Sequence, residues 1–131
     1  MELKVGIKGK RTLIVEEKML ANTVGSGAIP VFSTPWLVAL MEGAAQESIA
    51  DAIGEGNVTV GTSLEISHLA ATPLGMEVWA ESELIEVDGR RLVFNVVAYD
   101  GVEKIGEGKH QRFIVGAERF LDKCNGKKEK I

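Results

Sequence analysis

Cysteines, histidines and long apolar runs are scarce in this chain of 131 residues, and each shortage excludes a class of protein. The single cysteine, Cys124, cannot form an intrachain disulfide, which fits a reducing compartment. Two histidines and no clustered cysteines give little support to a metal site. The longest apolar stretch, Trp36 to Met41, is far too short to span a bilayer, and the residues after Met1 do not begin a secretory signal. We therefore expect a cytosolic protein that has no membrane segment and needs no metal or other cofactor.

An excess of positive charge is also missing. The 15 lysines and arginines are outnumbered by 19 aspartates and glutamates, so a nucleic-acid-binding surface is not expected. A small acidic protein can still hold one phosphorylated ligand locally, although the same basic residues would serve equally well as solvated charges on strand faces. The candidates are Arg90, Arg91, Lys104, Lys109 and Arg112. With 45% hydrophobic and 26% charged residues, the composition predicts a single globular domain over residues 1–131.

One long helix is predicted from about residue 34 to Ile53. Ser33 or Thr34 can cap its start, and Pro35 suits the first helical position because its missing amide hydrogen would have no partner there. Gly54 is expected to end it. Apolar side chains recur at helical spacing along one stripe, and Glu42 lies on the flank of that stripe.

Strand patterns occupy most of the remaining chain. We expect a first strand within residues 10–20, a loop over 22–30, and a long strand after Gly56 in which the even-numbered residues from Val58 to His68 share one face. Three more strands follow over 76–87, 91–99 and 102–115, with hairpins at Asp88-Gly89 and Asp100-Gly101. Residues 117–124 suggest a short helix, and 125–131 a charged, flexible tail. This order predicts an α+β fold in which an antiparallel five-stranded sheet wraps around one central helix.

Three side chains could carry chemistry. Glu42 places a carboxylate beside apolar residues, which is costly unless the carboxylate is paired or used; a partly exposed helix-edge glutamate is the alternative. His68 continues the apolar face of its strand, where a structural core histidine is the competing interpretation, whereas His110 lies among polar residues and suggests a surface role. Thr34 precedes a proline and could simply be a helix cap.

The spacing of Thr34 and Glu42 has a consequence for assembly. Eight residues of helix separate them by roughly 12 Å, so one small reacting group could hardly touch both within one chain. If both act on the same bond, a partner subunit supplies one of them, and we therefore expect a dimer. Gly61 is a weaker candidate, because a glycine within a strand can offer its amide to an oxyanion but is equally explained by a bulge.

Together these segments resemble the hotdog-fold acyl-CoA thioesterases, specifically the group like the fluoroacetyl-CoA-specific thioesterase. The resemblance runs from about Val31 to Val115. It rests on Val31-Phe32 with Thr34, Leu40-Met41-Glu42, His68 with Ala70-Ala71-Thr72-Pro73, Gly89-Arg90-Arg91-Leu92, and Ile105-Gly106 with Gly108.

The resemblance implies a catalytic trio of Thr34, Glu42 and His68, with Gly61 near the thioester carbonyl. It also implies that Phe32, Arg90 and Arg91 contact the substrate, and that two sheets join edge to edge in a homodimer whose sites lie at the interface. A further pairing into a dimer of dimers stays open.

The implied activity is hydrolysis of a small acyl-CoA. One departure concerns the lid, where the fluoroacetyl-specific enzyme carries a phenylalanine and residues 25–29 of this chain have no aromatic side chain. Selectivity for fluoroacetyl-CoA is therefore not expected to carry over. Two alternatives remain, a dehydratase of the same fold acting on acyl thioesters and a non-catalytic module that binds acyl-CoA.

Overall fold

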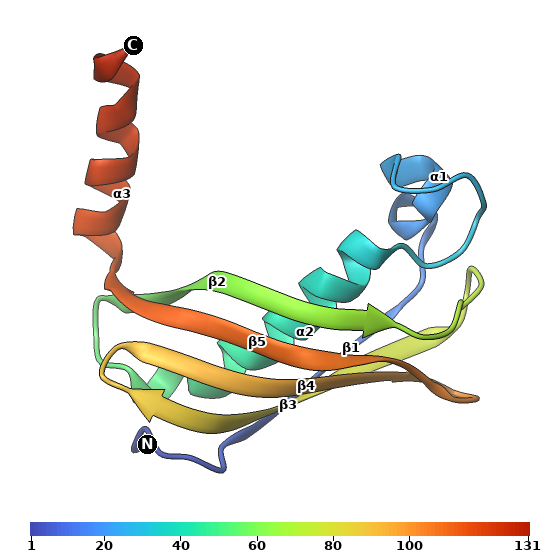
Figure 1. Ribbon diagram of the computed structural model, residues 1–131, viewed down its shortest axis with the longest axis horizontal. Helices are drawn as coiled ribbons and strands as arrows, with labels where there is room; N and C mark the ends of the chain where they lie inside the picture. The colour runs from blue at the N-terminus through green and yellow to red at the C-terminus, as the bar shows by residue number, and fades with distance from the viewer.

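The computed structural model describes all 131 residues, Met1–Ile131. Five antiparallel strands form one sheet in the order β1-β3-β4-β5-β2, and the sheet curves around the helix α2 (Figure 1). The strands are β1 (Lys8–Ile14), β2 (Asn57–His68), β3 (Glu77–Asp88), β4 (Arg91–Asp100) and β5 (Lys104–Gly116). This arrangement confirms the α+β class and the five-stranded sheet around a central helix.

The helix α2 spans Thr34–Ile49 and forms the centre of the core. Ser33 is its N-cap, with a side chain that accepts a hydrogen bond from the Trp36 amide, so Thr34 is the first helical residue and Pro35 the second. The last turn tightens into the 3-10 helix η2 (Ala50–Ala52), and Gly54 follows with a φ of +92°. Buried helix residues facing the sheet are Leu37, Leu40, Met41, Ala44, Ala45 and Ile49.

Both expected hairpins are present. Asp88 pairs with Arg91 across the turn between β3 and β4, where Gly89 adopts a φ of +60°. The turn between β4 and β5 is instead organised by a side chain, because Asp100 Oδ1 accepts hydrogen bonds from the amides of Val102 and Glu103. The two hairpins align β3, β4 and β5 as a meander over α2.

The strand β2 departs from the expected alternation. Its pairing with β5 shifts register between Gly61 and Ser63, so that Thr62 is an extra residue. A bulge of this kind reverses which parity faces the helix. Thr59 is buried and Gly61 lies against Glu42, although both were predicted to lie on the face opposite His68. The prediction that all even-numbered residues from Val58 to His68 share one face is therefore wrong for the residues that precede the bulge.

The N-terminal third differs from the sequence expectation in its boundaries. β1 begins earlier than predicted and ends at Ile14, and the chain then forms a 3-10 helix, η1 (Glu17–Met19). Part of the expected loop is the short helix α1 (Ala21–Val24), which Gly25 ends with a φ of +92°. Residues 25–30 then return to α2 without regular structure, so the expected lid is a short helix followed by a loop.

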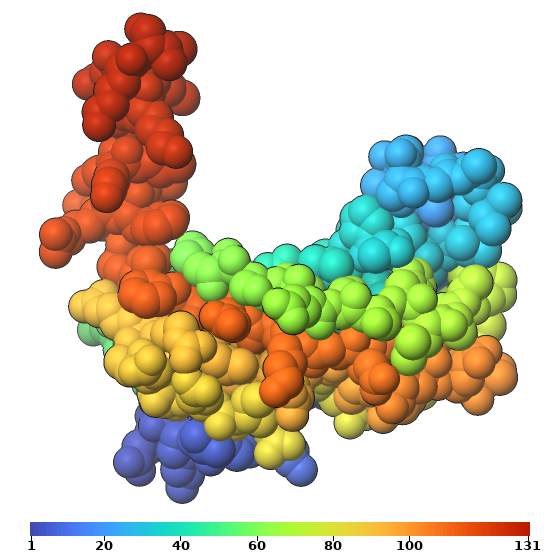
Figure 2. All heavy atoms as spheres, viewed as in Figure 1, coloured from blue at the N-terminus to red at the C-terminus, as the bar shows by residue number.

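The C-terminal helix α3 (Ala117–Asn125) leaves the end of β5 and projects away from the sheet (Figure 1). Residues expected as part of a tail continue it as the 3-10 helix η3 (Gly126–Lys130). In the space-filling view, α3 and the segment around α1 rise at opposite ends of the molecule and leave a saddle over β2 (Figure 2). β2 is also an edge of the sheet, so one side of this strand is unpaired. No helix combines the length and hydropathy needed to span a bilayer.

Candidate active site

Thr34 and His68 meet at the start of α2. Because Ser33 takes the capping role, the Thr34 hydroxyl is free, and its Oγ1 lies 2.7 Å from His68 Nδ1. His68 is the last residue of β2, so a strand end and a helix start bring together two side chains that are 34 positions apart. The other ring nitrogen, Nε2, is buried and has no hydrogen-bond partner. A buried polar atom without a partner is costly, so this nitrogen has an unused capacity for one hydrogen bond.

A pocket of about 320 Å³ opens beside this pair. Thr34 and His68 line it together with Phe32 and with residues of the segment that follows α1. Phe32 itself is fully buried. A volume of this size lies at the small end of ligand pockets.

The segment after His68 is held in place by a buried polar contact. Thr72 Oγ1 donates a hydrogen bond of 2.7 Å to Asp100 Oδ2, and the Thr72 carbonyl accepts one from the Phe32 amide. Burial would raise the pKa of the Asp100 carboxyl, but the hydrogen bonds from Thr72, Val102 and Glu103 outweigh burial and keep the pKa below its ordinary value. Asp100 thus stays ionised and anchors one wall of the pocket to the turn between β4 and β5.

Glu42 belongs to a second cluster, two turns farther along α2. Its side chain is 36% exposed, and its Oε2 lies 3.4 Å from Arg112 Nη1 and 4.0 Å from His110 Nε2. Arg112 is itself fixed by β2, because its Nε and Nη2 donate to the hydroxyl and the carbonyl of Thr59. A rigid guanidinium therefore holds one carboxylate oxygen from the sheet side, and part of the carboxylate remains open to solvent.

The protonation of His110 follows from its neighbours. Arginine can only donate, so the 3.1 Å contact from Arg112 Nη1 makes His110 Nε2 an acceptor and leaves the proton on Nδ1, which donates to the Ser63 carbonyl. Burial lowers the pKa of His110, and the charge of Arg112 acts in the same direction, against the Ser63 and Glu42 contacts. Burial also lowers the pKa of the Arg112 guanidinium, with Glu42 opposing. His110 is therefore a neutral spacer, and Arg112 is the cation of the cluster.

His68 is also neutral near pH 7. Burial lowers its pKa, with the backbone of Ala70 opposing. A neutral imidazole carries a hydrogen on only one ring nitrogen. Whether Nδ1 donates or accepts in its hydrogen bond with Thr34 therefore decides whether Nε2 carries that hydrogen. When the Thr34 hydroxyl donates to Nδ1, Nε2 bears the hydrogen and is a donor.

Gly61 explains how the backbone comes close to Glu42. A Cβ atom built at this glycine would overlap Glu42 Oε2 and lie 3.3 Å from both Arg112 Nη1 and His110 Cε1. Only a residue without a side chain leaves room for the carboxylate, and the bulge at Thr62 turns Gly61 toward it.

The predicted side chains thus form two groups within one chain, Thr34 with His68 and Glu42 with Gly61. No hydrogen bond or ion pair joins the two groups. His110 was predicted to lie at the surface, and this is wrong because the side chain is fully buried. Reading period two backward from Ile114, which faces the core, would have placed Arg112 and His110 on the same inward face.

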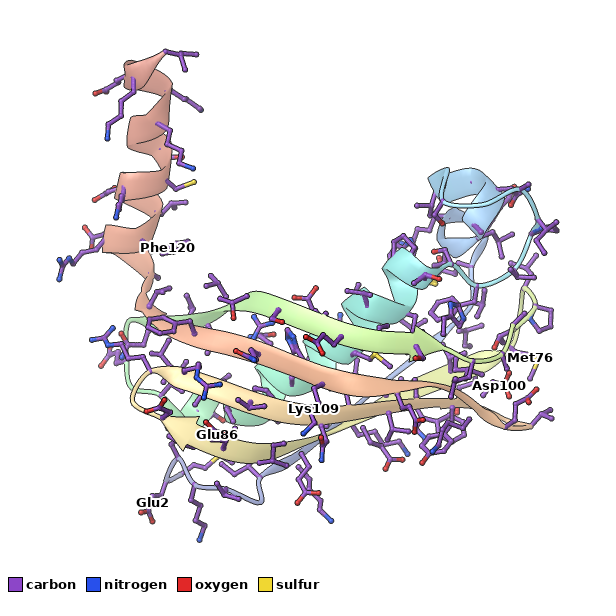
Figure 3. The ribbon with its side chains drawn as sticks, in the orientation of Figure 1. Glu2, Met76, Glu86, Asp100, Lys109 and Phe120 are labelled. Atoms are coloured by element: carbon purple, nitrogen blue, oxygen red, sulfur yellow. The ribbon has the colours of Figure 1, made fainter.

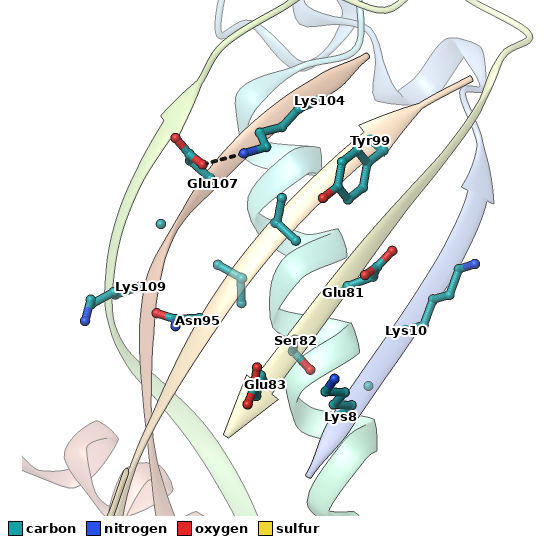
Figure 4. Close-up of a pocket in the computed structure, with 14 residues that line it drawn as sticks. Lys8, Lys10, Glu81, Ser82, Glu83, Asn95, Tyr99, Lys104, Glu107 and Lys109 are labelled. Atoms are coloured by element: carbon teal, nitrogen blue, oxygen red, sulfur yellow. Dashed lines mark hydrogen bonds and ion pairs between the residues drawn. The ribbon is translucent and has the colours of Figure 1, made fainter. Parts of the chain in front are cut away.

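The remaining basic candidates differ in the residues that they contact. Arg91 forms ion pairs with Glu86 and Asp88, and Lys104 pairs with Glu107 at 2.9 Å. Lys104 and Lys109 line a hollow of about 770 Å³ on the sheet face opposite α2 (Figure 4). That hollow carries lysines and glutamates together and contains none of the predicted catalytic residues. Arg90 forms no ion pair. No group of three or more histidine, cysteine or acidic side chains is arranged to hold a metal ion.

Comparison with known proteins places this geometry in a family. The family model of the fluoroacetyl-CoA-specific thioesterase matches residues 15–118. A fluoroacetyl-CoA thioesterase of Streptantibioticus cattleyicolor is 41% identical over 97 residues, which cover 74% of this chain and 70% of that protein.

Solved structures agree with the family match. A variant of the fluoroacetyl-CoA-specific thioesterase FlK superposes with a TM-score of 0.90 at 33% identity, covering 97% of this chain and 98% of that one. A thioesterase superfamily member from Thermus thermophilus superposes with a TM-score of 0.88 at 26% identity, covering 97% of this chain and 94% of that one. The chain therefore has the hotdog fold and belongs to the fluoroacetyl-CoA-specific thioesterase family.

Proposed function

We infer that this protein is a thioester hydrolase that cleaves a small acyl-CoA to the free acid and CoA. The observation that carries the inference is the Glu42 carboxylate, which is held by a buried arginine yet remains partly open to solvent. Family membership supplies the reaction class, since the matched relatives are acyl-CoA thioesterases by name. Water attacks the thioester carbonyl, the carbon–sulfur bond breaks, and the CoA sulfur takes up a proton.

Glu42 is the residue that we propose drives the attack. It acts either as the general base that removes a proton from water, or as the nucleophile that forms a short-lived anhydride which water then cleaves. Arg112 donates a hydrogen bond to Glu42 Oε2 and thereby fixes the position of the carboxylate that both routes use. Because Arg112 contacts only Oε2, the other carboxylate oxygen is free to face the reacting group.

His68 and Thr34 are proposed to serve the carbonyl and the leaving group. With the Thr34 hydroxyl donating to Nδ1, His68 Nε2 bears a hydrogen that no protein group accepts, and we propose that this hydrogen stabilises the carbonyl oxygen or protonates the departing sulfur. The Gly61 amide is the proposed second donor to the oxyanion.

The two groups of residues become one site in a dimer. Antiparallel pairing of two copies through the free edge of β2 would run the His68 end of one strand toward the Asn57 end of the other. That arrangement brings the Thr34–His68 pair of one copy toward the Glu42 of its partner. The long unpaired edge supports it, because such an edge is seldom left exposed.

The acyl group is proposed to be short. The pocket beside Thr34 is small, and two of the matched solved structures are the FlK thioesterase with fluoroacetate or acetyl-CoA bound. Residues 25–29 offer no aromatic side chain to this pocket, so we expect acetyl-CoA and other short acyl-CoAs to be cleaved without strong preference for the fluorinated substrate.

Thiol release from a panel of short, branched, aromatic and fluorinated acyl-CoAs tests the proposal, with Glu42→Gln and His68→Ala measured in parallel. We expect hydrolysis of the short esters, and a loss of turnover on the order of 100-fold in Glu42→Gln with its fold retained. A change in acyl unsaturation without thiol release would identify a dehydratase. Thermal stabilisation by acyl-CoA without any product would identify a binding module.

A further inference from the structure

A second pocket, of about 620 Å³, lies where α3 leaves the sheet. It is bounded by the ends of β2 and β5, by the turn between β3 and β4, and by the first two turns of α3. Phe120, at the base of α3, lies beside this end of the sheet (Figure 3). The pocket contains no residue of the site described above.

The charge of this pocket is unusual for an acidic protein. Three of its lining residues are cationic, Arg90 from the turn and Arg119 and Lys123 from α3, and none is acidic. None of the three cations forms an ion pair. Arg119 and Lys123 are four positions apart and therefore share one face of the helix, whereas Glu118 and Asp122 occupy neighbouring positions outside the pocket lining. The pocket therefore concentrates uncompensated positive charge.

Two aromatic rings stand beside these cations. Phe113 of β5 is 40% exposed and Phe120 of α3 is 45% exposed, and both line the pocket. Exposed phenyl faces next to arginine and lysine are the chemistry that recognises nucleotides, because bases stack on aromatic rings and phosphates bind guanidinium and ammonium groups. Inorganic phosphate alone would make no use of the rings.

We propose that this pocket binds the nucleotide end of CoA, an adenosine that carries a 3′-phosphate and a 5′-diphosphate. The proposal rests on the proposed function and extends it to the part of the substrate far from the reacting bond. Gly116, at the end of the pocket, is about 13 Å from Arg112 along β5. An extended pantetheine arm can bridge that span, so the thioester reaches the Glu42 region while the phosphates stay at α3.

The test compares two substrates that differ only in the nucleotide. An Arg119→Gln, Lys123→Gln double variant is measured with an acyl-CoA and with the same acyl group on pantetheine. We expect KM for the CoA ester to rise on the order of tenfold with kcat retained, and no change for the pantetheine ester. Lys128→Gln, which removes a lysine charge outside the pocket, is the matched control and should behave as wild type. Equal impairment of both substrates, or no effect on either, would overturn the proposal.

Direct binding separates this proposal from the proposed function. Adenosine 3′,5′-bisphosphate is titrated into the wild type, the double variant and Phe120→Leu, with calorimetric detection. Binding to the wild type that weakens in both variants supports the subsite even if no thioester is cleaved. Turnover of acyl-CoA together with bisphosphate binding that is absent, or unchanged in the variants, would defeat the subsite and leave the hydrolase intact.

Discussion

The position of the Glu42 carboxylate depends on Gly61. A methyl group at position 61 would overlap Oε2, and because that atom ends a flexible side chain, the carboxylate rather than the backbone would move. We expect Gly61→Ala to fold normally and to lose about 10²-fold in kcat, since a displacement of about 1 Å can cost that much. Gly101→Ala is the matched control, because a Cβ there meets no atom. Unchanged turnover in Gly61→Ala, measured by thiol release, would show that Glu42 does not act from its present position.

Buried His110 makes the stability of the protein depend on pH. Its pKa is lowered in the folded state, so as pH falls below about 6.5 the unfolded chain binds a proton that the folded chain resists. The free energy of unfolding therefore decreases as the pH falls from about 6.5 to the pKa of His110 in the folded state, by at most about 1.4 kcal/mol per pH unit.

The His110→Gln variant isolates this contribution. Glutamine keeps an acceptor for Arg112 and does not titrate, so urea unfolding between pH 7 and pH 5 should show a shallower decline in the variant. Identical pH slopes in the two proteins would mean that His110 binds its proton equally well in the folded and unfolded chains, and that its pKa is not lowered by folding.

The contacts of individual residues were the hardest feature to predict from the sequence. Thr34 was also explained by a helix cap, whereas Glu42 and His68 stood out because each has an unusual side chain for its periodic position. The partners of Glu42 did not, because Arg112 is 70 positions away and lies in a run of polar residues that resembles a surface. Strand pairing decides which cation contacts the carboxylate, and the local sequence pattern does not indicate that pairing.

At the scale of elements, two adjacent hydroxyl groups at the start of α2 have different roles. Ser33 caps the helix and Thr34 bonds His68, so their substitutions should have opposite signatures. We expect Ser33→Ala to lower the free energy of unfolding by about 1 kcal/mol. Thr34→Val should keep stability and lower kcat roughly tenfold, as expected for one lost hydrogen bond. Denaturant unfolding and thiol release measure the two effects. If Thr34→Val lowered the free energy of unfolding as much as Ser33→Ala does, Thr34 would be a helix-capping residue and the prediction would be wrong.

Elements with strong local signals were predictable, and irregular ones were not. The helix α2 has a proline near its start and a glycine after its end, and both hairpins carry Asp-Gly, so their places followed from sequence. The bulge in β2 had no such signal beyond Gly61 itself. An extra residue is accommodated only because β5 pairs on both sides of it, and this non-local register decided which residues face the helix.

At the scale of the whole molecule, the arrangement of the sheet leaves β2 as an unpaired edge of 12 residues beside both groups of site residues. The proposed dimer would cover this edge and complete two equivalent sites. Each complete site would then draw Glu42 from one chain and Thr34 with His68 from the other, because the two groups are not in contact within one chain.

Complementation between two inactive variants tests this assembly. Glu42→Gln and His68→Ala are co-expressed with different affinity tags, and the mixed dimer is purified through both. One of its two sites would contain an intact Glu42 facing an intact His68, and the other would lack both, so we expect about half of the wild-type kcat per dimer. The two parent homodimers, each with both sites defective, serve as controls and should stay near background. If the complete site instead lay within one chain, neither chain of the mixed dimer would hold all its residues and no activity would return. Failure to recover any doubly tagged species would equally contradict the edge-to-edge dimer, because the free β2 strand would then have no second copy to pair with.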